Sequence, residues 1–257
     1  MINNPTPTLP GYARLKEDVD KIEGFLANTS IAVWDALMAY QESRYVTGHL
    51  GEIGVYKGKS ATILARHQRA NEELWLIDFS NFLDEAKTNL SPLARHDIRY
   101  IKQKSVEIFR HPELAQHRRT FRWFHIDGEH TGQAVATDLA LAHDLLADDG
   151  IICIDDFLNP AYPQITAATF AFLQANRYDL TMFACGYNKG YLARPTYARH
   201  YLTMIRDTLA TELTARGVND FTLWKTAPSQ DYDCWGIHFR YGDRDYRGLD
   251  SNPDEIC

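Results

Sequence analysis

Three carboxylates that follow two apolar segments are the residues of this chain that most clearly suggest chemistry. Asp127 comes directly after the apolar run 121–126. Asp155 and Asp156 come directly after the apolar run 151–154. Between the runs, apolar residues recur at helical spacing, which predicts a strand, a crossover helix and a second, parallel strand. Neighbouring parallel strands end at one edge of a sheet, so we expect the carboxylates to converge where open α/β sheets bind ligands.

Composition limits the class of protein. The chain has 257 residues, 45% of them hydrophobic, which suffices for one large α/β domain or one domain with an appendage. The net charge of −7 and the lack of a Lys/Arg cluster argue against nucleic-acid binding, which depends on neutralising phosphates. The four cysteines have no paired spacing, and no apolar window approaches about 18 residues. We therefore expect a soluble, cytoplasmic enzyme that binds neither nucleic acid nor membrane.

The other apolar runs predict the rest of a doubly wound sheet. Three further strands are expected at 49–53, 74–77 and 98–101. Two more, at 178–184 and 190–193, are separated by the sequence GYNK and predict a hairpin. The predicted fold class is α/β: a doubly wound, mostly parallel, seven-stranded Rossmann-like sheet with an antiparallel edge hairpin, N-terminal helices and a C-terminal extension.

Helical segments are expected on both sides of this sheet. Apolar residues from Leu15 to Leu26 predict an amphipathic helix, and Ser30 could cap a second helix that runs from Ile31 to about Gln41. Residues 162–175 and 197–215 also look helical, and short strands are expected at 221–224 and 235–239. The Pro- and Asn-rich lead 1–10 is expected to be loosely held.

The turn after the first strand limits what the sheet can bind. It runs Glu52-Ile53-Gly54-Val55-Tyr56-Lys57-Gly58-Lys59-Ser60. A dinucleotide site requires G-x-G-x-x-G, in which the backbone comes close to a pyrophosphate, and that pattern is absent. A nucleoside triphosphate loop requires an earlier glycine at a spacing that this turn also lacks.

The motif E-x-G-x-x-x-G-x-S, together with the acids that close the second and fourth strands, resembles the class I S-adenosylmethionine-dependent methyltransferases. Within that superfamily the chain is most similar to the metal-dependent small-molecule O-methyltransferases, which include catechol-type and sugar or macrolide tailoring enzymes. The resemblance covers about residues 45–195. It implies a sheet that binds S-adenosylmethionine and methylates a hydroxyl of a small molecule.

The resemblance implies a role for each residue of the turn. Gly54 and Gly58 would let the backbone approach the methionine part of the cofactor, and Ser60 would bind its carboxylate at a helix N-terminus. Glu52 and Tyr56 match positions that line the methionine end and the sulfonium. The alternative is an ordinary tight turn.

Two further residues match cofactor positions of the family. Asp78 would accept hydrogen bonds from both ribose hydroxyls, which needs an acceptor-only group at the strand end. Its alternative role is to cap the helix that begins near Asn81. Ser105 matches a position near the adenine.

The family's metal ligands match Asp127, Asp155 and Asp156, and Asp127 also adjoins the cofactor. Oxygen ligands suit Mg²⁺, or Mn²⁺ as a substitute, and three carboxylates at one edge would repel each other without a cation. Alternatively, Asp127 caps a helix and the other two only solvate a strand end. Catechol-type enzymes have Asp then Asn at the last two positions, so Asp then Asp makes the sugar-tailoring relatives the nearer match.

His130 forms a D-x-x-H motif with Asp127, where catechol-type enzymes have D-x-x-K with the lysine as general base. Because an imidazole has a pKa near 6.5, His130 could accept a hydroxyl proton at neutral pH. Alternatively, His130 only ends the turn, and Thr131 caps the next helix. His125, inside an apolar strand, is expected in the core or beside the cofactor.

These observations predict an S-adenosylmethionine-dependent, Mg²⁺-dependent O-methyltransferase whose substrate is a natural product, a sugar or a phenol. The catalytic residues would be His130 and Asp127. One alternative is a nicotinamide-dependent oxidoreductase, against which the missing G-x-G-x-x-G counts. Another is a catalytically silent protein that binds the cofactor without turnover.

The ends of the chain should determine specificity and assembly. We divide the chain into an N-terminal helical segment (1–45) that caps the site or forms a dimer contact, the methyltransferase domain (46–195), and a substrate or oligomer region (196–257). A homo-oligomer is expected. The aromatic residues of the two ends could form core or substrate wall: Trp34, Tyr40, Trp224, Tyr232, Trp235, Phe239 and Tyr241.

Overall fold

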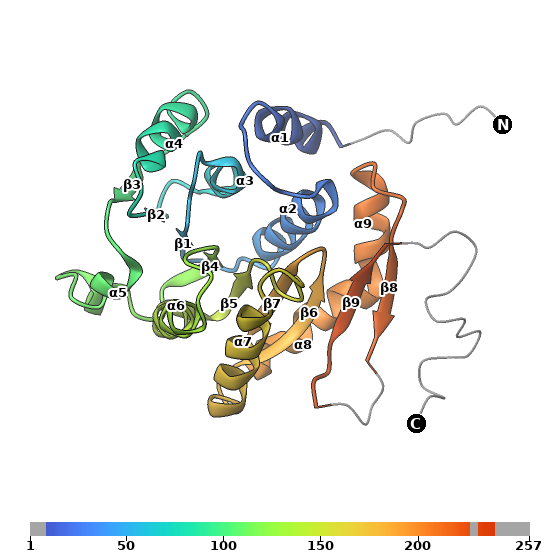
Figure 1. The fold of residues 1–257 in the computed structure, drawn as a ribbon. Helices are drawn as coiled ribbons and strands as arrows, with labels where there is room; N and C mark the ends of the chain where they lie inside the picture. Colours follow the sequence, from blue (N-terminus) through green and yellow to red (C-terminus); the bar gives the residue numbers. More distant parts are fainter. Residues whose placement is uncertain (1–8, 227–230, 240–257) are drawn as a thin grey trace.

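A single sheet with helices on both faces organises residues 9–226 and 231–239, which the computed structural model describes (Figure 1). The expectation for the lead before residue 9 and the possible role of Tyr241 lie outside these residues. The strand order is β3-β2-β1-β4-β5-β7-β6-β9-β8. The bounds are β1 (His49–Ile53), β2 (Leu74–Ile77), β3 (Ile98–Ile101), β4 (Phe121–Ile126), β5 (Leu146–Ile154), β6 (Thr181–Gly186), β7 (Lys189–Ala193), β8 (Thr222–Lys225) and β9 (Trp235–His238).

The topology places a ligand site at the C-terminal ends of β1 and β4. Strands β1 to β5 are parallel, and the strand order reverses between β1 and β4, which makes a topological switch point. Glu52 pairs with His125 and Ile53 pairs with Ile126. The residues that follow these strands therefore lie side by side, as the sequence predicted.

The predicted fold class is confirmed, but the sheet has nine strands instead of seven. Strand β9 pairs in parallel with β6, and β8 pairs antiparallel with β9. The β6–β7 hairpin therefore lies inside the sheet and not at its edge. Its turn residues Tyr187 and Asn188 have φ of 50° and 65°, as two-residue hairpin turns require.

The starts of two strands differ from the prediction by three residues or more, and other strand ends differ by one or two residues. Strand β5 begins at Leu146 instead of 151, because Leu146 pairs with Phe121 ahead of a register shift. Strand β6 begins at Thr181 instead of 178, because Leu180 N–H still donates to Asn176 C=O at the end of the preceding helix.

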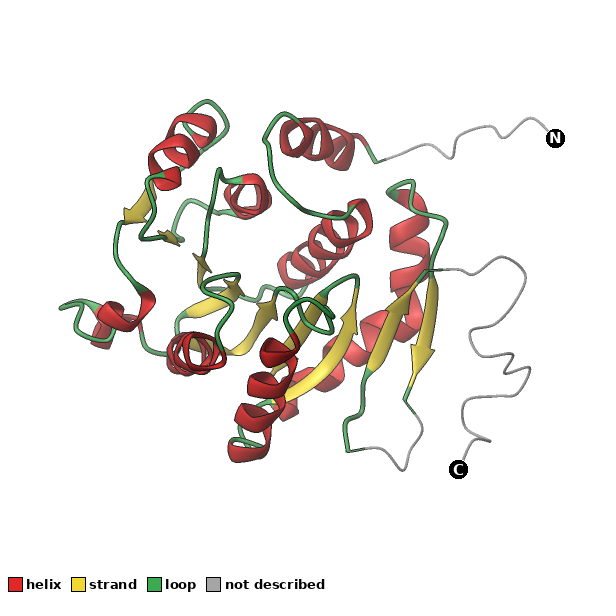
Figure 2. Cartoon of the chain, viewed as in Figure 1, coloured by secondary structure: helices red, strands yellow, loops and turns green. Residues whose placement is uncertain are grey.

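The helices pack in two layers, and Figure 2 shows them on both sides of the strands. One buried cluster joins the sheet to α1–α4, α8 and α9, and the other joins it to α5, α6 and α7. No helix of the described ranges is long and apolar enough to cross a membrane. The bounds are α1 (Pro10–Asp20), α2 (Asn28–Ser43), α3 (Lys59–His67), α4 (Phe82–Leu90), α5 (Ser105–Ile108), the 3₁₀ turn η1 (Leu114–His117), α6 (Gly132–Leu145), α7 (Pro163–Ala175), α8 (Pro195–Met204), the π-helical turn η2 (Ile205–Leu209) and α9 (Ala210–Ala215).

The first two helices differ from the sequence prediction. Helix α1 ends at Asp20, so Phe25 and Leu26 lie in the connection to α2. Gly24 in this connection has φ of 155°, a value that other residues rarely adopt. Helix α2 begins at Asn28, and Ser30 is not its cap but donates to the carbonyl of Tyr187. This bond ties the helix to the hairpin turn.

Candidate active site

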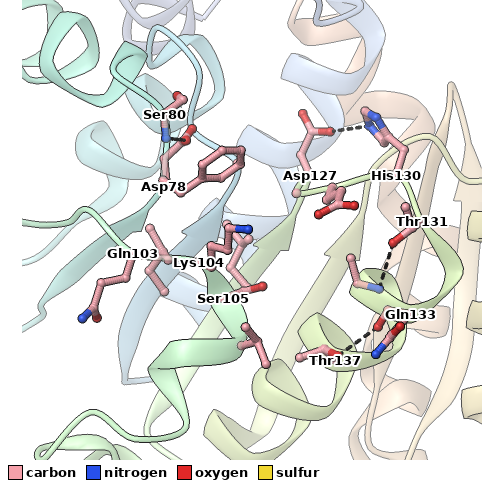
Figure 3. A pocket seen from close by; sticks show the side chains of 18 of the residues that line it. Asp78, Ser80, Gln103, Lys104, Ser105, Asp127, His130, Thr131, Gln133 and Thr137 are labelled. Carbon is pink, nitrogen blue, oxygen red and sulfur yellow. Dashed lines mark hydrogen bonds and ion pairs between the residues drawn. The ribbon is translucent and has the colours of Figure 1, made fainter.

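A cavity of about 660 Å³ opens at the C-terminal ends of β1, β2 and β4, within the size range of small-molecule sites (Figure 3). An adjoining cavity of about 170 Å³ is lined by Ser60 and Asp155, and shares Gly54, Tyr56 and Asp127 with the first. The site residues predicted from the sequence that line the larger cavity are Gly54, Tyr56, Asp78, Ser105, Asp127 and His130.

The two glycines of the turn are required by packing. Gly54 has φ of 82°, and a Cβ there would lie 1.7 Å from the carbonyl oxygen of Asp127. Gly58 has φ of 91°, and a Cβ would press on Ala86 and Leu90 of α4 at 3.3 Å. Close contact between the β1 and β4 loops thus suffices to explain Gly54, and the approach of a cofactor to these glycines stays a prediction.

Asp78 holds the turn in place from the end of β2. Its Oδ2 accepts the N–H groups of Val55 and Tyr56 at 2.9 and 3.1 Å. Its Oδ1 accepts the N–H of Ser80 at 2.8 Å, drawn in Figure 3. A carboxylate has about four acceptor positions, so Asp78 retains capacity for a ligand hydroxyl.

Glu52 lies beneath the cavities, not in their walls. Its side chain is fully buried and accepts hydrogen bonds from Ser60 Oγ and from His125 Nδ1, the latter at 2.7 Å. A direct contact of Glu52 with the methionine end of a cofactor therefore stays a prediction. The hydroxyl of Ser60 donates a hydrogen bond to Glu52. A ligand bound to Ser60 would therefore be connected to Glu52 indirectly, by way of the Ser60 hydroxyl.

A row of four buried charged side chains crosses the sheet under the rim. It consists of Glu52 on β1, His125 on β4, Asp155 after β5 and Lys189 on β7, each at most 8% exposed. His125 Nε2 lies 3.6 Å from Asp155 Oδ2, and Lys189 Nζ donates to Asp155 Oδ1. The signs of charge alternate along the row, so each charge has an opposite neighbour.

The pKa values follow from this arrangement. Burial alone would lower the pKa of His125, but the neighbouring carboxylates of Asp155 and Glu52 outweigh it and raise the pKa to about 9. Burial alone would raise the pKa of Asp155, but His125 and Lys189 hold it below its usual range. His125, expected in the core or beside the cofactor, is thus a buried cation at neutral pH.

Asp127, His130 and Asp156 form a more exposed group at the rim. His130 Nε2 lies 3.5 Å from Asp127 Oδ1 and 3.1 Å from Asp156 Oδ2. Each of the three offers a ligand atom within 4.8 Å of the others, and a second such group combines Asp127 with His125 and Asp155. Burial raises the pKa of Asp127 to about 6, and the neighbouring imidazole of His130 opposes that rise.

Neighbouring side chains fix the orientation of His130. Its ring stacks on that of Tyr162, with the ring centroids 4.3 Å apart and an angle of 14° between the planes. The backbone carbonyl oxygen of His130 accepts a hydrogen bond from Gln164 Nε2. Thr131 accepts the N–H of Ala134 and caps α6, as expected. His130 therefore sits beside a helix cap and faces two carboxylates, so both interpretations of the sequence fit the geometry.

Sequence reasoning missed Lys189, Tyr162 and the buried Asp138 as parts of this site. Lys189 lies in the hairpin turn motif, and only the antiparallel pairing of β7 with β5 brings it to Asp155. Asp138 lies on α6, where burial raises its pKa to about 6 and the hydroxyl of Ser105 opposes that rise. The missed signal is a polar residue within an otherwise apolar helix face.

Comparison with models of protein families gives a match for the central part of the chain. A family model described as "Methyltransferase domain" matches residues 52–157, which span the turn, Asp78 and the three carboxylates. Residues 52–157 therefore match a methyltransferase domain, the class of enzyme that the sequence resembles. No curated protein matches the sequence.

Solved structures share the fold of this methyltransferase domain. The SAH-bound methyltransferase PaMTH1 of Podospora anserina is 14% identical with a TM-score of 0.53, over 74% of this chain and 90% of that one. CalS11, a TDP-rhamnose 3′-O-methyltransferase of calicheamicin biosynthesis, is 15% identical with a TM-score of 0.52, over 71% and 92%. TomG of Streptomyces achromogenes, an O-methyltransferase of tomaymycin synthesis in complex with SAM, is 16% identical with a TM-score of 0.50, over 74% and 91%. At these identities the likeness concerns the fold.

The buried row predicts a non-additive effect on stability. His125→Gln should lower the free energy of unfolding by about 3–5 kcal/mol, because it leaves Glu52 buried without its cation, while Asp155 keeps Lys189. Adding Glu52→Gln to that variant should restore part of the loss, because it removes one uncompensated charge. Urea unfolding at pH 7 of the two single variants and the double variant measures this coupling. Strictly additive losses would contradict a charge interaction between these residues.

Proposed function

We propose that this methyltransferase transfers the methyl group of S-adenosylmethionine to a hydroxyl of a small molecule, with a divalent cation at the rim. The observation that carries the proposal is one juxtaposition. The cavity of the methyltransferase domain, lined by the glycine turn and Asp78, opens onto a rim where Asp127 and Asp156 face His130. The residues proposed to bind the cofactor thus adjoin residues whose chemistry suits a proton or a metal.

The residues around the cavity fit the cofactor. Asp78 has acceptor capacity left for a ribose hydroxyl, Ser105 lies farther along the same cavity, and Ser60 stands in the first turn of α3, where N–H groups favour a carboxylate. S-adenosylmethionine supplies a methyl group on a positively charged sulfur. The protein's task is mainly to hold the acceptor oxygen in line with that group, which is a proximity effect.

The rim residues fit a divalent cation. Asp127 and Asp156 offer oxygen ligands from partly exposed side chains, and both face the same imidazole. Oxygen ligands favour Mg²⁺ or Mn²⁺. Such an ion would lower the pKa of a coordinated hydroxyl. Two carboxylates would balance the charge of one divalent ion.

His130 is the residue we propose as general base, with Asp127 beside it. Stacking on Tyr162 fixes the ring, and its Nε2 is directed to the rim. A positioned imidazole can accept the proton that the acceptor hydroxyl loses. The competing role for His130 is that of a nitrogen ligand to the cation, since it belongs to the same group of donors.

The substrate class follows from the fold relatives and from the size of the site. CalS11 and TomG act in natural-product biosynthesis according to their descriptions, and one of them methylates a sugar nucleotide. A cavity of about 660 Å³ holds a small molecule and not a folded protein. We therefore propose a sugar, phenolic or other natural-product hydroxyl as acceptor.

The purified protein should bind S-adenosylmethionine or its demethylated product, and Asp78→Ala should weaken binding. The expected loss is about 1.5–3 kcal/mol, the range for hydrogen bonds to a charged group. Because Asp78 also holds the turn, Asp78→Asn serves as the control that keeps the side-chain volume. Calorimetry measures both variants. No heat and no thermal shift with either ligand would remove the cofactor proposal.

Activity should disappear in excess chelator and return with Mg²⁺ or Mn²⁺. Asp156→Asn should raise the Mg²⁺ concentration required for half-maximal rate, while its affinity for the cofactor product should stay close to that of the unmodified protein. Initial rates at varied Mg²⁺ and calorimetry with the product separate the two effects. Full turnover in chelator would show that the rim carboxylates have another role.

His130→Ala distinguishes a base from a ligand. For a base, the maximal rate should fall by about 10²–10⁴-fold while the Mg²⁺ requirement stays constant. For a metal ligand, the Mg²⁺ requirement should rise first, and saturating metal should recover much of the rate. His200→Ala, on the exposed face of α8, is the control. An unchanged rate and an unchanged metal requirement would leave His130 as a turn residue only.

A further inference from the structure

We propose that Lys189 is the counter-ion of Asp155 and prevents this carboxylate from coordinating a divalent cation. The carboxylate ligands of the cation are then Asp127 and Asp156. The inference rests on the metal site of the proposed function and deepens it. It concerns a positioning residue that the family resemblance does not assign. It also changes the set of three carboxylates expected from the sequence to a set of two.

Backbone pairing fixes the contact between the two side chains. Ile154 pairs with Gly190 and Cys153 pairs with Tyr191 in the antiparallel β5–β7 ladder. The next pair in this register is Asp155 with Lys189. Side chains of directly opposed residues point to the same face, so both lie on the face that Cys153 and Tyr191 occupy. The ammonium group of Lys189 therefore lies next to the carboxylate of Asp155 on one face of the sheet.

Burial makes this ion pair difficult to open. Lys189 is 3% exposed, and lysine is almost never buried to that extent unless it is paired. Its Nζ donates to Asp155 Oδ1, which also accepts the N–H of Asp156 at 2.7 Å. A cation that took Asp155 would leave an ammonium buried without its partner, and the desolvation of that charge would oppose binding.

The other carboxylates are placed differently. The other oxygen of Asp155 faces the buried ring of His125 at 3.6 Å. The side chains of Asp127 and Asp156 are 34% and 17% exposed and share His130 as their neighbour. A cation that enters from solvent meets these two carboxylates, whose combined charge matches that of Mg²⁺. The buried row and the metal rim are adjacent, because Asp127 also lies with His125 and Asp155 in one group of ligand atoms within 4.8 Å. The ion pair with Lys189 distinguishes Asp155 from the other two carboxylates.

The test is a calorimetric titration of Mn²⁺ into the full chain saturated with S-adenosylhomocysteine. The charge-balanced double variant Lys189→Met/Asp155→Asn should bind Mn²⁺ within about threefold of the unmodified protein, since the inference removes only a pair that the metal does not contact. Asp156→Ala should weaken Mn²⁺ binding by about tenfold or more, as loss of a ligand does. Lys189→Met alone should tighten binding by about tenfold or more, because it releases the carboxylate of Asp155.

Controls separate this role from a structural one. Lys189→Arg keeps the charge and should bind Mn²⁺ like the unmodified protein, and so should Lys102→Met, which changes an exposed lysine paired with Asp84. A merely structural lysine would affect unfolding but not Mn²⁺ affinity. Should Lys189→Met fail to fold, the double variant still decides, because it leaves no unpaired charge at the two positions.

A double variant that loses as much Mn²⁺ affinity as Asp156→Ala would overturn the inference, because Asp155 would then be a ligand. If the unmodified protein and Lys189→Met both bind no Mn²⁺ while S-adenosylhomocysteine binds, the inference fails together with the metal site, and the methyl-transfer proposal stands. Failure of S-adenosylhomocysteine itself to bind would instead remove the proposed function.

Discussion

The buried row of Glu52, His125, Asp155 and Lys189 is the constraint on which the site depends. Four charges withdrawn from water are tolerated only because the signs alternate and each member has a neighbour of opposite charge. The row runs across the neighbouring strands β1, β4, β5 and β7. The strand order therefore places the opposite charges next to one another, and the charge pairs in turn stabilise that order. Sliding any of these strands by one residue would move its charged side chain to the other face of the sheet.

Much of the fold could be predicted because local patterns determine it. Strands β1 to β4 have the bounds that their runs of mainly apolar residues indicate, since strands covered on both faces are mostly apolar. The start of β5 could not be predicted, because Asp148, Asp149 and Gly150 look like a turn although Leu146 pairs with Phe121. The joining of β9 to β6 was equally hidden, because it depends on contacts between segments about 50 residues apart in the sequence.

The candidate site divides in the same way. Residues at strand ends, such as Asp78, Asp127 and Asp156, could be placed from the sequence because a strand end fixes where its side chain emerges. Lys189 could not, because its partner is defined by an antiparallel pairing that no local pattern encodes. Three carboxylates at one edge of the sheet need a nearby cation, but the sequence does not identify which cation it is. For Asp155 the structure supplies two from the protein, His125 and Lys189.

The row also explains why the N-terminal helices belong to the architecture of the site. Trp34 of α2 is fully buried, with its ring 4.6 Å from that of His125 and 5.2 Å from that of Trp123. It covers the row on the face opposite α6, where open water would otherwise solvate the charges and weaken their interactions. Ser30 fixes the start of the same helix to the turn that presents Lys189. A helix that looked like a cap or a dimer contact in the sequence thus shields His125 of the charged row, and a contact with a second subunit could use only its remaining surface.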